Sequence, residues 1–272
     1  MSALTSRLMH IRRYDAVHGV EVLDDVAAEE PLEIRVEGES LAVVMRTPGH
    51  DREVAAGFLL SEEVIRSARD LFDITTCVPS GDGSKGNAVD VALANPASFD
   101  RKNLTRHVFT SSSCGICSKA SIDAVLKTRA SLTDEMRVSP ELLLSLPSRL
   151  AGQQETFRKT GGLHACALFT ARGELLAVRE DVGRHNALDK LIGWALLEGR
   201  TPLAGHVVLL SGRASFEMMQ KSHSAGIAVV AAISAPSTLA VDFANESGQT
   251  LAGFVRGHGM NVYAGAHRLL PG

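Results

Sequence analysis

The alternation of hydrophobic and polar residues predicts that the early part of the chain is built mainly from short strands. Residues 32–36 alternate between apolar and polar side chains, as a half-buried strand does, and residues 41–45 form a more continuous apolar run. The turn-like residues 37–40 between them indicate a β-hairpin. After a polar break, Asp51 is placed to cap a helix whose apolar face includes Phe58. Two further strands are expected, at residues 71–78 and 89–93.

Later in the chain, helices and strands alternate. Ser139 followed by Pro140 is typical of a helix start, and a second helix is expected within residues 149–160. The elements predicted after it are strands at 163–170 and 175–178, a helix around 188–196, a strand at 207–210, a helix after Ser215, a strand at 227–233, a helix after Ser237 and a strand at 251–255.

This order of elements indicates the fold class. Strands that alternate with helices are typical of a parallel sheet covered by helices. We therefore expect an α/β protein with three α/β/α layers and a mixed, mostly parallel sheet. Residues 1–110 would form a β-rich N-terminal part and residues 111–272 the α/β part. The pattern leaves open whether these parts are independent domains.

Composition and charge argue against several classes of function. The chain of 272 residues has a net charge of −3 and only 4% aromatic residues, which argues against a nucleic-acid-binding surface. It has no apolar run long enough to span a bilayer, and its first 15 residues lack the apolar block of a secretory signal. Four cysteines are too few for a disulfide framework in a chain of this length. We expect a cytoplasmic protein with reduced thiols and no membrane insertion.

Two of those cysteines, Cys114 and Cys117, form a Cys-x-x-Cys motif that follows three serines and precedes a helix-like segment. A helix N-terminus lowers the pKa of a thiol because its dipole stabilises the thiolate, and Lys119 adds positive charge. A persulfide carrier fits this pattern best, a dithiol oxidoreductase second and a metal site third. The metal reading lacks further ligands, because Cys77 and Cys166 lie in strand-like runs where small core residues are expected.

Polar residues gather at the ends of the strands predicted in the α/β part. In open α/β sheets ligands bind at strand ends, and exposed amides, helix N-termini and arginine forks suit phosphate groups. A single junction of this kind is usually just a cap and a turn. Five at corresponding ends of one sheet instead predict a groove for an anionic ligand. The five junctions are residues 160–164, 179–186, 211–215, 234–237 and 256–259.

The same segments carry a family resemblance. In order along the chain, they are Arg46-Thr47-Pro48-Gly49-His50-Asp51, Ser112-Ser113-Cys114-Gly115-Ile116-Cys117, Thr160-Gly161-Gly162-Leu163-His164, Arg179-Glu180-Asp181-Val182-Gly183-Arg184-His185-Asn186-Ala187-Leu188-Asp189-Lys190, Leu210-Ser211-Gly212-Arg213, Ser234-Ala235-Pro236-Ser237 and Gly253-Phe254-Val255-Arg256. They resemble the motifs of the FdhD/NarQ family of sulfur-carrier proteins needed for active formate dehydrogenase. Ser118 departs from the glycine that many members have there.

The resemblance implies a fold, partners and a cargo. The fold would be cytidine-deaminase-like without the deaminase zinc site, and no metal ligands are expected. A cysteine desulfurase would pass sulfur to the motif as a persulfide, with Cys114 as the carrier and Cys117 as an assisting or resolving thiol. The sulfur would then reach the molybdenum or tungsten of the bis-molybdopterin guanine dinucleotide cofactor before that cofactor enters formate dehydrogenase. The protein would act as a homodimer.

The resemblance also implies where that cofactor binds. The stretch Phe254-Val255-Arg256-Gly257-His258-Gly259 would form part of the site, and GDP or other guanine nucleotides would mimic the cofactor's arms. We expect Arg184 and Arg213, together with Arg256, to contact phosphate or guanine, beside Ser211 and Gly212. His164 and His185 fit either ligand contacts or core histidines equally well. The alternative function is a cofactor-binding chaperone that transfers no sulfur.

Overall fold

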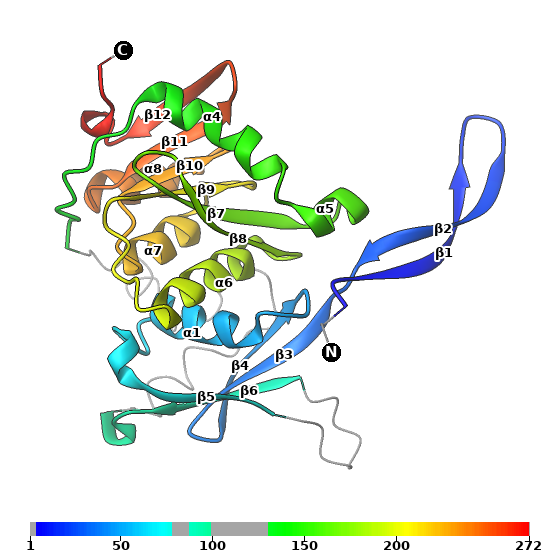
Figure 1. The fold of residues 1–272 in the computed structure, drawn as a ribbon, viewed down its shortest axis with the longest axis horizontal. Helices are drawn as coiled ribbons and strands as arrows, with labels where there is room; N and C mark the ends of the chain where they lie inside the picture. Colours follow the sequence, from blue (N-terminus) through cyan, green and yellow to red (C-terminus); the bar gives the residue numbers. More distant parts are fainter. Residues whose placement is uncertain (1–3, 78–86, 99–129, 272) are drawn as a thin grey trace.

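The N-terminal part contains a long ribbon and a small sheet. The computed structural model describes residues 4–77, 87–98 and 130–271. Strands β1 (Ser6–Tyr14) and β2 (Gly19–Ala27) pair antiparallel as a ribbon that extends away from the rest of the molecule (Figure 1). A four-stranded sheet follows, in the order β4-β3-β6-β5. Its strands are β3 (Glu30–Val36), β4 (Glu39–Arg46), β5 (Leu71–Cys77) and β6 (Ala88–Leu93).

The predicted hairpin and the first helix are present. Strands β3 and β4 pair antiparallel, as expected for residues 32–45. Helix α1 (Asp51–Ser61) begins one residue earlier than predicted, because His50 is the N-cap, with a φ of 59°, and Asp51 lies in the first turn. The Asp51 carboxylate accepts hydrogen bonds from Arg46 Nε and Nη2 at 2.9 and 3.0 Å, so it anchors the preceding loop.

The C-terminal part is built on a six-stranded sheet with the order β12-β11-β10-β9-β7-β8. Its strands are β7 (His164–Thr170), β8 (Leu175–Asp181), β9 (His206–Leu210), β10 (Val229–Ala232), β11 (Thr250–Arg256) and β12 (Gly259–Ala264). Only the β9–β10 and β10–β11 pairs are parallel. The prediction of a mostly parallel sheet is therefore wrong, and the sheet is mixed. Tight turns join β7 to β8 and β11 to β12, and a short turn forces neighbouring strands to run antiparallel.

Helices cover both faces of this sheet, as the predicted three layers require. One face packs on α4 (Pro140–Ala151), whose N-cap Ser139 accepts a hydrogen bond from Leu142 N at 3.2 Å. The opposite face packs on α6, α7 and α8. These helices span Arg184–Leu197, Phe216–Ser224 and Thr238–Glu246. The shorter elements are α5 (Glu155–Thr160) and the 3₁₀ turns η1 (Ala68–Asp70), η2 (Pro96–Ser98) and η4 (Ala266–Arg268).

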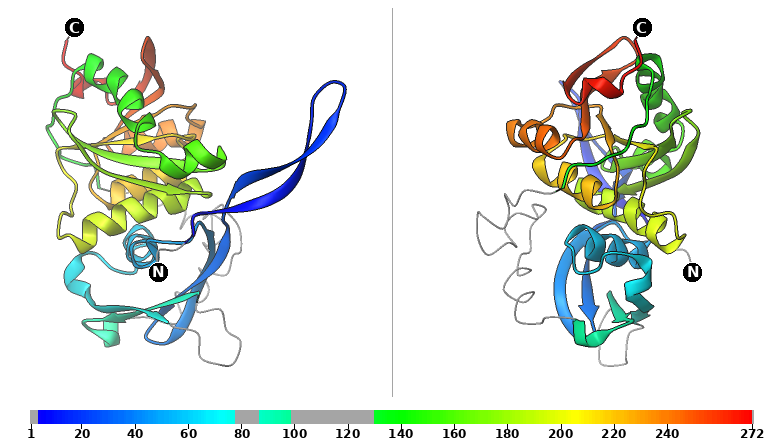
Figure 2. Two further views of the ribbon diagram at one scale, coloured as in Figure 1. Left: turned by 45° about the vertical axis from the view of Figure 1, so that its right-hand side comes forward. Right: turned by 90° about the vertical axis from the view of Figure 1, so that its left-hand side faces the viewer.

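The two parts share one hydrophobic core. Helix α1 lies between the four-stranded sheet and α6 (Figure 2), and a single cluster of buried side chains runs from Ile34 through Leu59 to Leu188. Helices α1 and α6 cross at Gly57 and Gly193, where their backbones lie in close contact. A Cβ atom on Gly193 would lie 1.8 Å from Glu53 O, and one on Gly57 would lie 1.9 Å from Asp189 O. Only glycine permits this approach. The predicted boundary at residue 110 falls outside the described residues, so the division into parts at 1–110 and 111–272 stays a prediction.

In the described residues, no helix combines the length and the apolar character needed to cross a membrane.

Candidate functional site

The five polar junctions lie together at one end of the six-stranded sheet, where β7 begins and β8, β9, β10 and β11 end. We call this end of the sheet the edge. The register places His164, at the start of β7, opposite Asp181 at the end of β8. The end of β9 lies beside the start of β7, and the ends of β10 and β11 follow in parallel. The predicted clustering is therefore confirmed. It includes the beginning of β7 rather than its end, because β7 runs opposite to β9.

Hydrogen bonds hold these junctions against one another. Ser211 N donates to Ala165 O at 2.9 Å, and Ala165 N donates to Ser211 Oγ at 2.8 Å. Further along the edge, Phe254 N donates to Ser234 O at 3.1 Å. A Cβ atom on Gly212 would lie 3.1 Å from His164 Nδ1, so this residue packs its backbone against the imidazole. Hydrogen bonds therefore connect the backbone of neighbouring junctions along the edge. Ser211 uses both its amide and its hydroxyl group in these bonds, so its role is structural.

Three arginine side chains place positive charge along this edge. Arg213 and Arg256 are exposed, whereas Arg184 is half-buried. The Arg184 Nε atom is shielded from solvent and has no hydrogen-bond partner among the described residues. Burial lowers the pKa of His164, and the neighbouring charges of Arg184 and His185 lower it further. A guanidinium donor without a partner, beside other cations, is suited to an anionic ligand.

The end of β11 has an unusual backbone. Phe254 adopts a φ of 52° at a bulge between Gly253 and Arg256, and its side chain is 38% exposed. The left-handed region is costly for a bulky residue, and such strain tends to occur at functional sites. Val255 is fully buried in the core, so this predicted cofactor-binding residue presents no surface to a ligand. Gly257 and His258 are exposed in the turn before β12.

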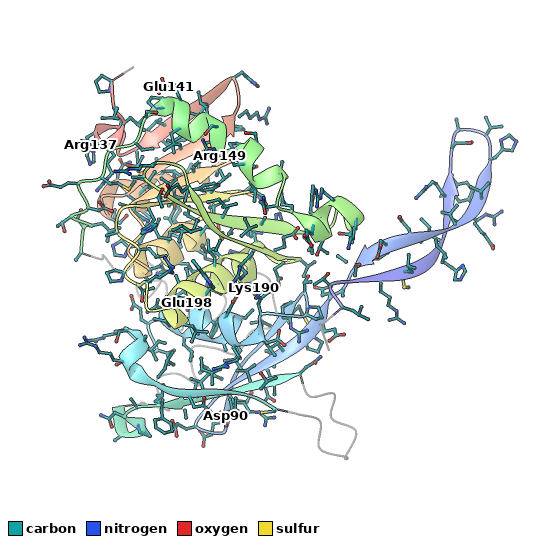
Figure 3. All side chains as sticks on the ribbon, in the orientation of Figure 1. Asp90, Arg137, Glu141, Arg149, Lys190 and Glu198 are labelled. Carbon is teal, nitrogen blue, oxygen red and sulfur yellow. The ribbon has the colours of Figure 1, made fainter. Side chains whose placement is uncertain are left out.

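A buried ion pair beneath the edge fixes the loop that follows β4. Lys190, labelled in Figure 3, extends from α6, and its Nζ atom lies 2.7 Å from Asp181 Oδ2. The same ammonium group donates to Thr47 O at 2.9 Å. Asp181 accepts hydrogen bonds from Thr47 N at 3.0 Å and Gly183 N at 2.8 Å. Within the Arg-Glu-Asp-Val-Gly-Arg-His-Asn run, Asp181 and Gly183 therefore hold the loop in place rather than face a ligand.

A second buried network joins α1, α6 and α7. Lys221 Nζ lies 2.9 Å from Asp189 Oδ2 and donates to Ser61 Oγ at 2.8 Å. Burial lowers the pKa of Lys221, but the attraction of Asp189 and Glu62 outweighs burial and raises the pKa. One turn closer to the edge, His185 Nε2 lies 2.6 Å from Glu217 Oε2.

The two histidines whose roles the sequence left open therefore lie in different environments. His185 is buried against Glu217, whereas His164 is half-buried at the edge. Sequence reasoning did not identify Asp189, Glu217 or Lys221. The available signal was the four-residue spacing of charged residues along otherwise apolar helix faces, which indicates buried charges that need partners.

Comparison with known proteins agrees with the motifs. The profile of the FdhD/NarQ family matches residues 27–270. The chain belongs to the FdhD/NarQ family. Its curated relatives include proteins named "Sulfur carrier protein FdhD" from Streptomyces avermitilis and Mycobacterium tuberculosis. The first is 54% identical over 274 residues, covering 99% of this chain and 97% of the relative. The second is 47% identical over 266 residues, covering 95% and 96%.

The fold of the chain is also found in a solved structure. It is similar to the crystal structure of a protein from Desulfotalea psychrophila described as a candidate formate dehydrogenase accessory protein. The TM-score is 0.78 at 22% sequence identity, and the match covers 98% of this chain and 100% of the other. At this identity the likeness supports the fold.

The structure describes Cys77 and Cys166 but not the Cys-x-x-Cys motif. Cys114 and Cys117 lie outside the described residues. Cys166 is fully buried, and burial raises the pKa of its thiol far above the usual range. Its Sγ atom lies 4.0 Å from Arg184 O, directly behind the edge. A buried protonated thiol is a poor nucleophile, so Cys166 is a core residue, as expected.

Proposed function

We propose that this protein accepts sulfur from a cysteine desulfurase as a persulfide on Cys114, assisted by Cys117. It would then deliver the sulfur to the bis-molybdopterin guanine dinucleotide cofactor required by formate dehydrogenase. The observation that carries the proposal is the cationic sheet edge, where Arg184 Nε has no hydrogen-bond partner in the part of the chain that the structure describes. The proposal includes action in the cytoplasm as a homodimer, and the cytidine-deaminase-like fold that the resemblance implies.

The thiol chemistry follows from exchange at sulfur. A Cys114 thiolate would attack the outer sulfur of the donor's persulfide, and the donor's sulfur–sulfur bond would break. The donor cysteine would leave as a thiolate, while the transferred sulfur keeps its oxidation state. The names of the relatives as sulfur carriers support this role. Among the described residues, no group of three His, Cys, Asp or Glu side chains is arranged to hold a metal ion.

The proposed cargo suits the sheet edge chemically. Its guanine dinucleotide arms carry several phosphate charges, which Arg184, Arg213 and Arg256 could neutralise with charge-assisted hydrogen bonds. The exposed ring of Phe254 offers an apolar surface on which a base could stack. Backbone at Gly212, Gly257 and Gly259 could approach a ligand closely because these positions have no side chain.

Replacement of Cys114 by alanine tests the sulfur-transfer step. Incubation of the wild-type protein with a cysteine desulfurase and cysteine, without oxygen, should add one sulfur atom to the Cys114 peptide, and dithiothreitol should remove it. The Cys114→Ala variant should gain no sulfur at that peptide and should leave formate dehydrogenase inactive in cells. Intact and peptide mass spectrometry measure the first result, and formate oxidation measures the second.

An internal control is available in the same protein. The Cys166 peptide should carry no added sulfur, because its thiol is buried and protonated. The chaperone alternative predicts instead that Cys114→Ala still yields active formate dehydrogenase, and that result would overturn the sulfur-transfer proposal.

Three arginine replacements test the cofactor edge. Arg184→Ala, Arg213→Ala and Arg256→Ala should each weaken GDP binding about 10- to 100-fold, since a hydrogen bond to a charged group contributes roughly 1.5–3 kcal/mol. Isothermal titration calorimetry measures the affinity. Arg172→Ala is the matched control, because Arg172 is exposed in the β7–β8 turn at the opposite edge of the sheet. Unchanged GDP affinity in all three variants would remove this assignment.

A further inference from the structure

The β1–β2 ribbon exposes far more hydrophobic surface than its size explains. It projects from the body of the protein (Figures 1 and 2), and eight of the sixteen exposed large hydrophobic side chains in the described residues lie within residues 4–26. A two-stranded ribbon has no second layer to cover its faces, and an isolated hairpin is only marginally stable in water. Large exposed apolar surfaces of this kind mark interaction sites.

The pairing register shows which face of the ribbon is the more apolar. Ile11 lies opposite Val22, Arg13 opposite Val20 and Arg7 opposite Val26, and alternate residues of a strand point to the same face. One face therefore carries five large apolar residues, Met9, Ile11, Val20, Val22 and Val26, together with the charged residues Arg7, Arg13 and Asp24. We call this surface the apolar ribbon face. Its side chains remain accessible, with Val20 55% and Met9 42% exposed. The opposite face carries only three large apolar residues, Leu8, Tyr14 and Leu23, with the same number of charged ones, Arg12, Glu21 and Asp25.

The charges on the ribbon indicate what covers it. The charged residues of β1 are all basic, namely Arg7, Arg12 and Arg13. Those of β2 are all acidic, namely Glu21, Asp24 and Asp25. A partner of a single charge sign would be attracted by one strand and repelled by the other. A second copy of the ribbon carries both signs in the same arrangement.

Symmetry selects how two ribbons can meet. A twofold axis parallel to the ribbons, with the apolar faces together, places each basic strand over the acidic strand of the other copy. Edge-to-edge pairing by a twofold axis would instead join β1 to β1 or β2 to β2, which sets like charges side by side. Face-to-face packing alone satisfies both the apolar surface and the charges.

We propose that the apolar ribbon face packs against the same face of a second copy of this chain, and that the ribbon is the dimerisation arm. This assigns a surface to the homodimer of the proposed function. It does not depend on the sulfur chemistry, because the oligomeric mass can be measured without a desulfurase or a cofactor.

Glutamate substitutions on opposite faces of the ribbon test the assignment. Val22→Glu, at the centre of the apolar ribbon face, should convert a dimer of the full-length protein into a monomer in sedimentation-velocity experiments at micromolar concentration. Met9→Glu should have the same effect. Leu23→Glu is the matched control, because Leu23 is adjacent to Val22 in sequence but points to the opposite face, and its exposed fraction of 55% is close to the 42% of Met9.

The outcomes separate clearly. Circular dichroism should show the same secondary structure in all three variants, because the ribbon lies outside the core clusters. A monomeric wild-type protein would overturn the proposal. A dimer that survives both Val22→Glu and Met9→Glu, or one that only Leu23→Glu disrupts, would also overturn it. Sulfur loading of Cys114 in the wild-type protein is a separate measurement, so failure here is distinct from failure of the proposed sulfur transfer.

Discussion

Replacing Lys221 with methionine is expected to destabilise the protein by about 3–5 kcal/mol, because removing one member of a buried ion pair leaves the other charge uncompensated. Lys221 and Asp189 have side-chain exposures of only 5% and 3%. The variant would leave the Asp189 carboxylate in the core with Ser61 as its remaining hydrogen-bond donor. Urea unfolding followed by circular dichroism measures the loss.

The pH dependence of that loss follows from burial. Burial raises the pKa of Asp189, and replacing Lys221 removes the cation that opposes this effect. The folded variant would then hold a proton that the unfolded chain releases above about pH 4. Stability should therefore fall as the pH rises from 5 to 8, so the deficit relative to wild type should be larger at pH 8.

A double variant separates the charge effect from the packing effect. Asp189→Leu combined with Lys221→Met removes both charges and should recover most of the lost stability, since a hydrophobic pair of similar volume often replaces a buried ion pair at little cost. A Lys221→Met variant with wild-type stability at pH 8 would show that Asp189 does not need its partner.

Replacing Gly193 with alanine is expected to cost about 3 kcal/mol, at the upper end of the usual range for overpacking. The new Cβ atom would lie 1.8 Å from Glu53 O, and a backbone atom cannot rotate away as a flexible side chain can. Helices α1 and α6 would have to separate. Alanine's better helix propensity returns at most about 1 kcal/mol. Thermal and urea unfolding should both show the change.

Gly152→Ala is the matched control for Gly193→Ala. Gly152 is the C-cap of α4, with a φ of −69° that any residue adopts, and its nearest neighbouring atom is 4.0 Å from the added Cβ. The free energy of unfolding of the Gly152→Ala variant should stay within about 0.5 kcal/mol of the wild-type value. If Gly193→Ala were equally neutral, the close crossing of the two helices would not exist in solution.

Local patterns predicted local structure well. The β3–β4 hairpin, the Ser139 cap of α4 and the gathering of polar strand ends at one edge all follow from short-range rules of periodicity and capping. These rules did not predict whether neighbouring strands run parallel or antiparallel. Fully buried runs in β7, β9 and β10 have the same composition whether their neighbours are parallel or antiparallel.

Two other features could not be predicted from the sequence, each for a different physical reason. The β1–β2 ribbon exposes both faces to solvent, so apolar and charged residues mix without the alternation that marks a half-buried strand. Asp189 and Lys221 are charged, and charged side chains in a sequence usually indicate a solvated surface. Only the tertiary structure shows that these two lie inside, facing each other.

The Asp181 carboxylate limits how modular this protein can be. Two of its donors come from Thr47 and Lys190, which lie 143 residues apart in the chain. A chimera that joined the first half of one relative to the second half of another would inherit this junction from two parents. Such an exchange should succeed only where the loop of the first parent places the backbone N–H and C=O groups of residue 47 within reach of Asp181 and Lys190 of the second.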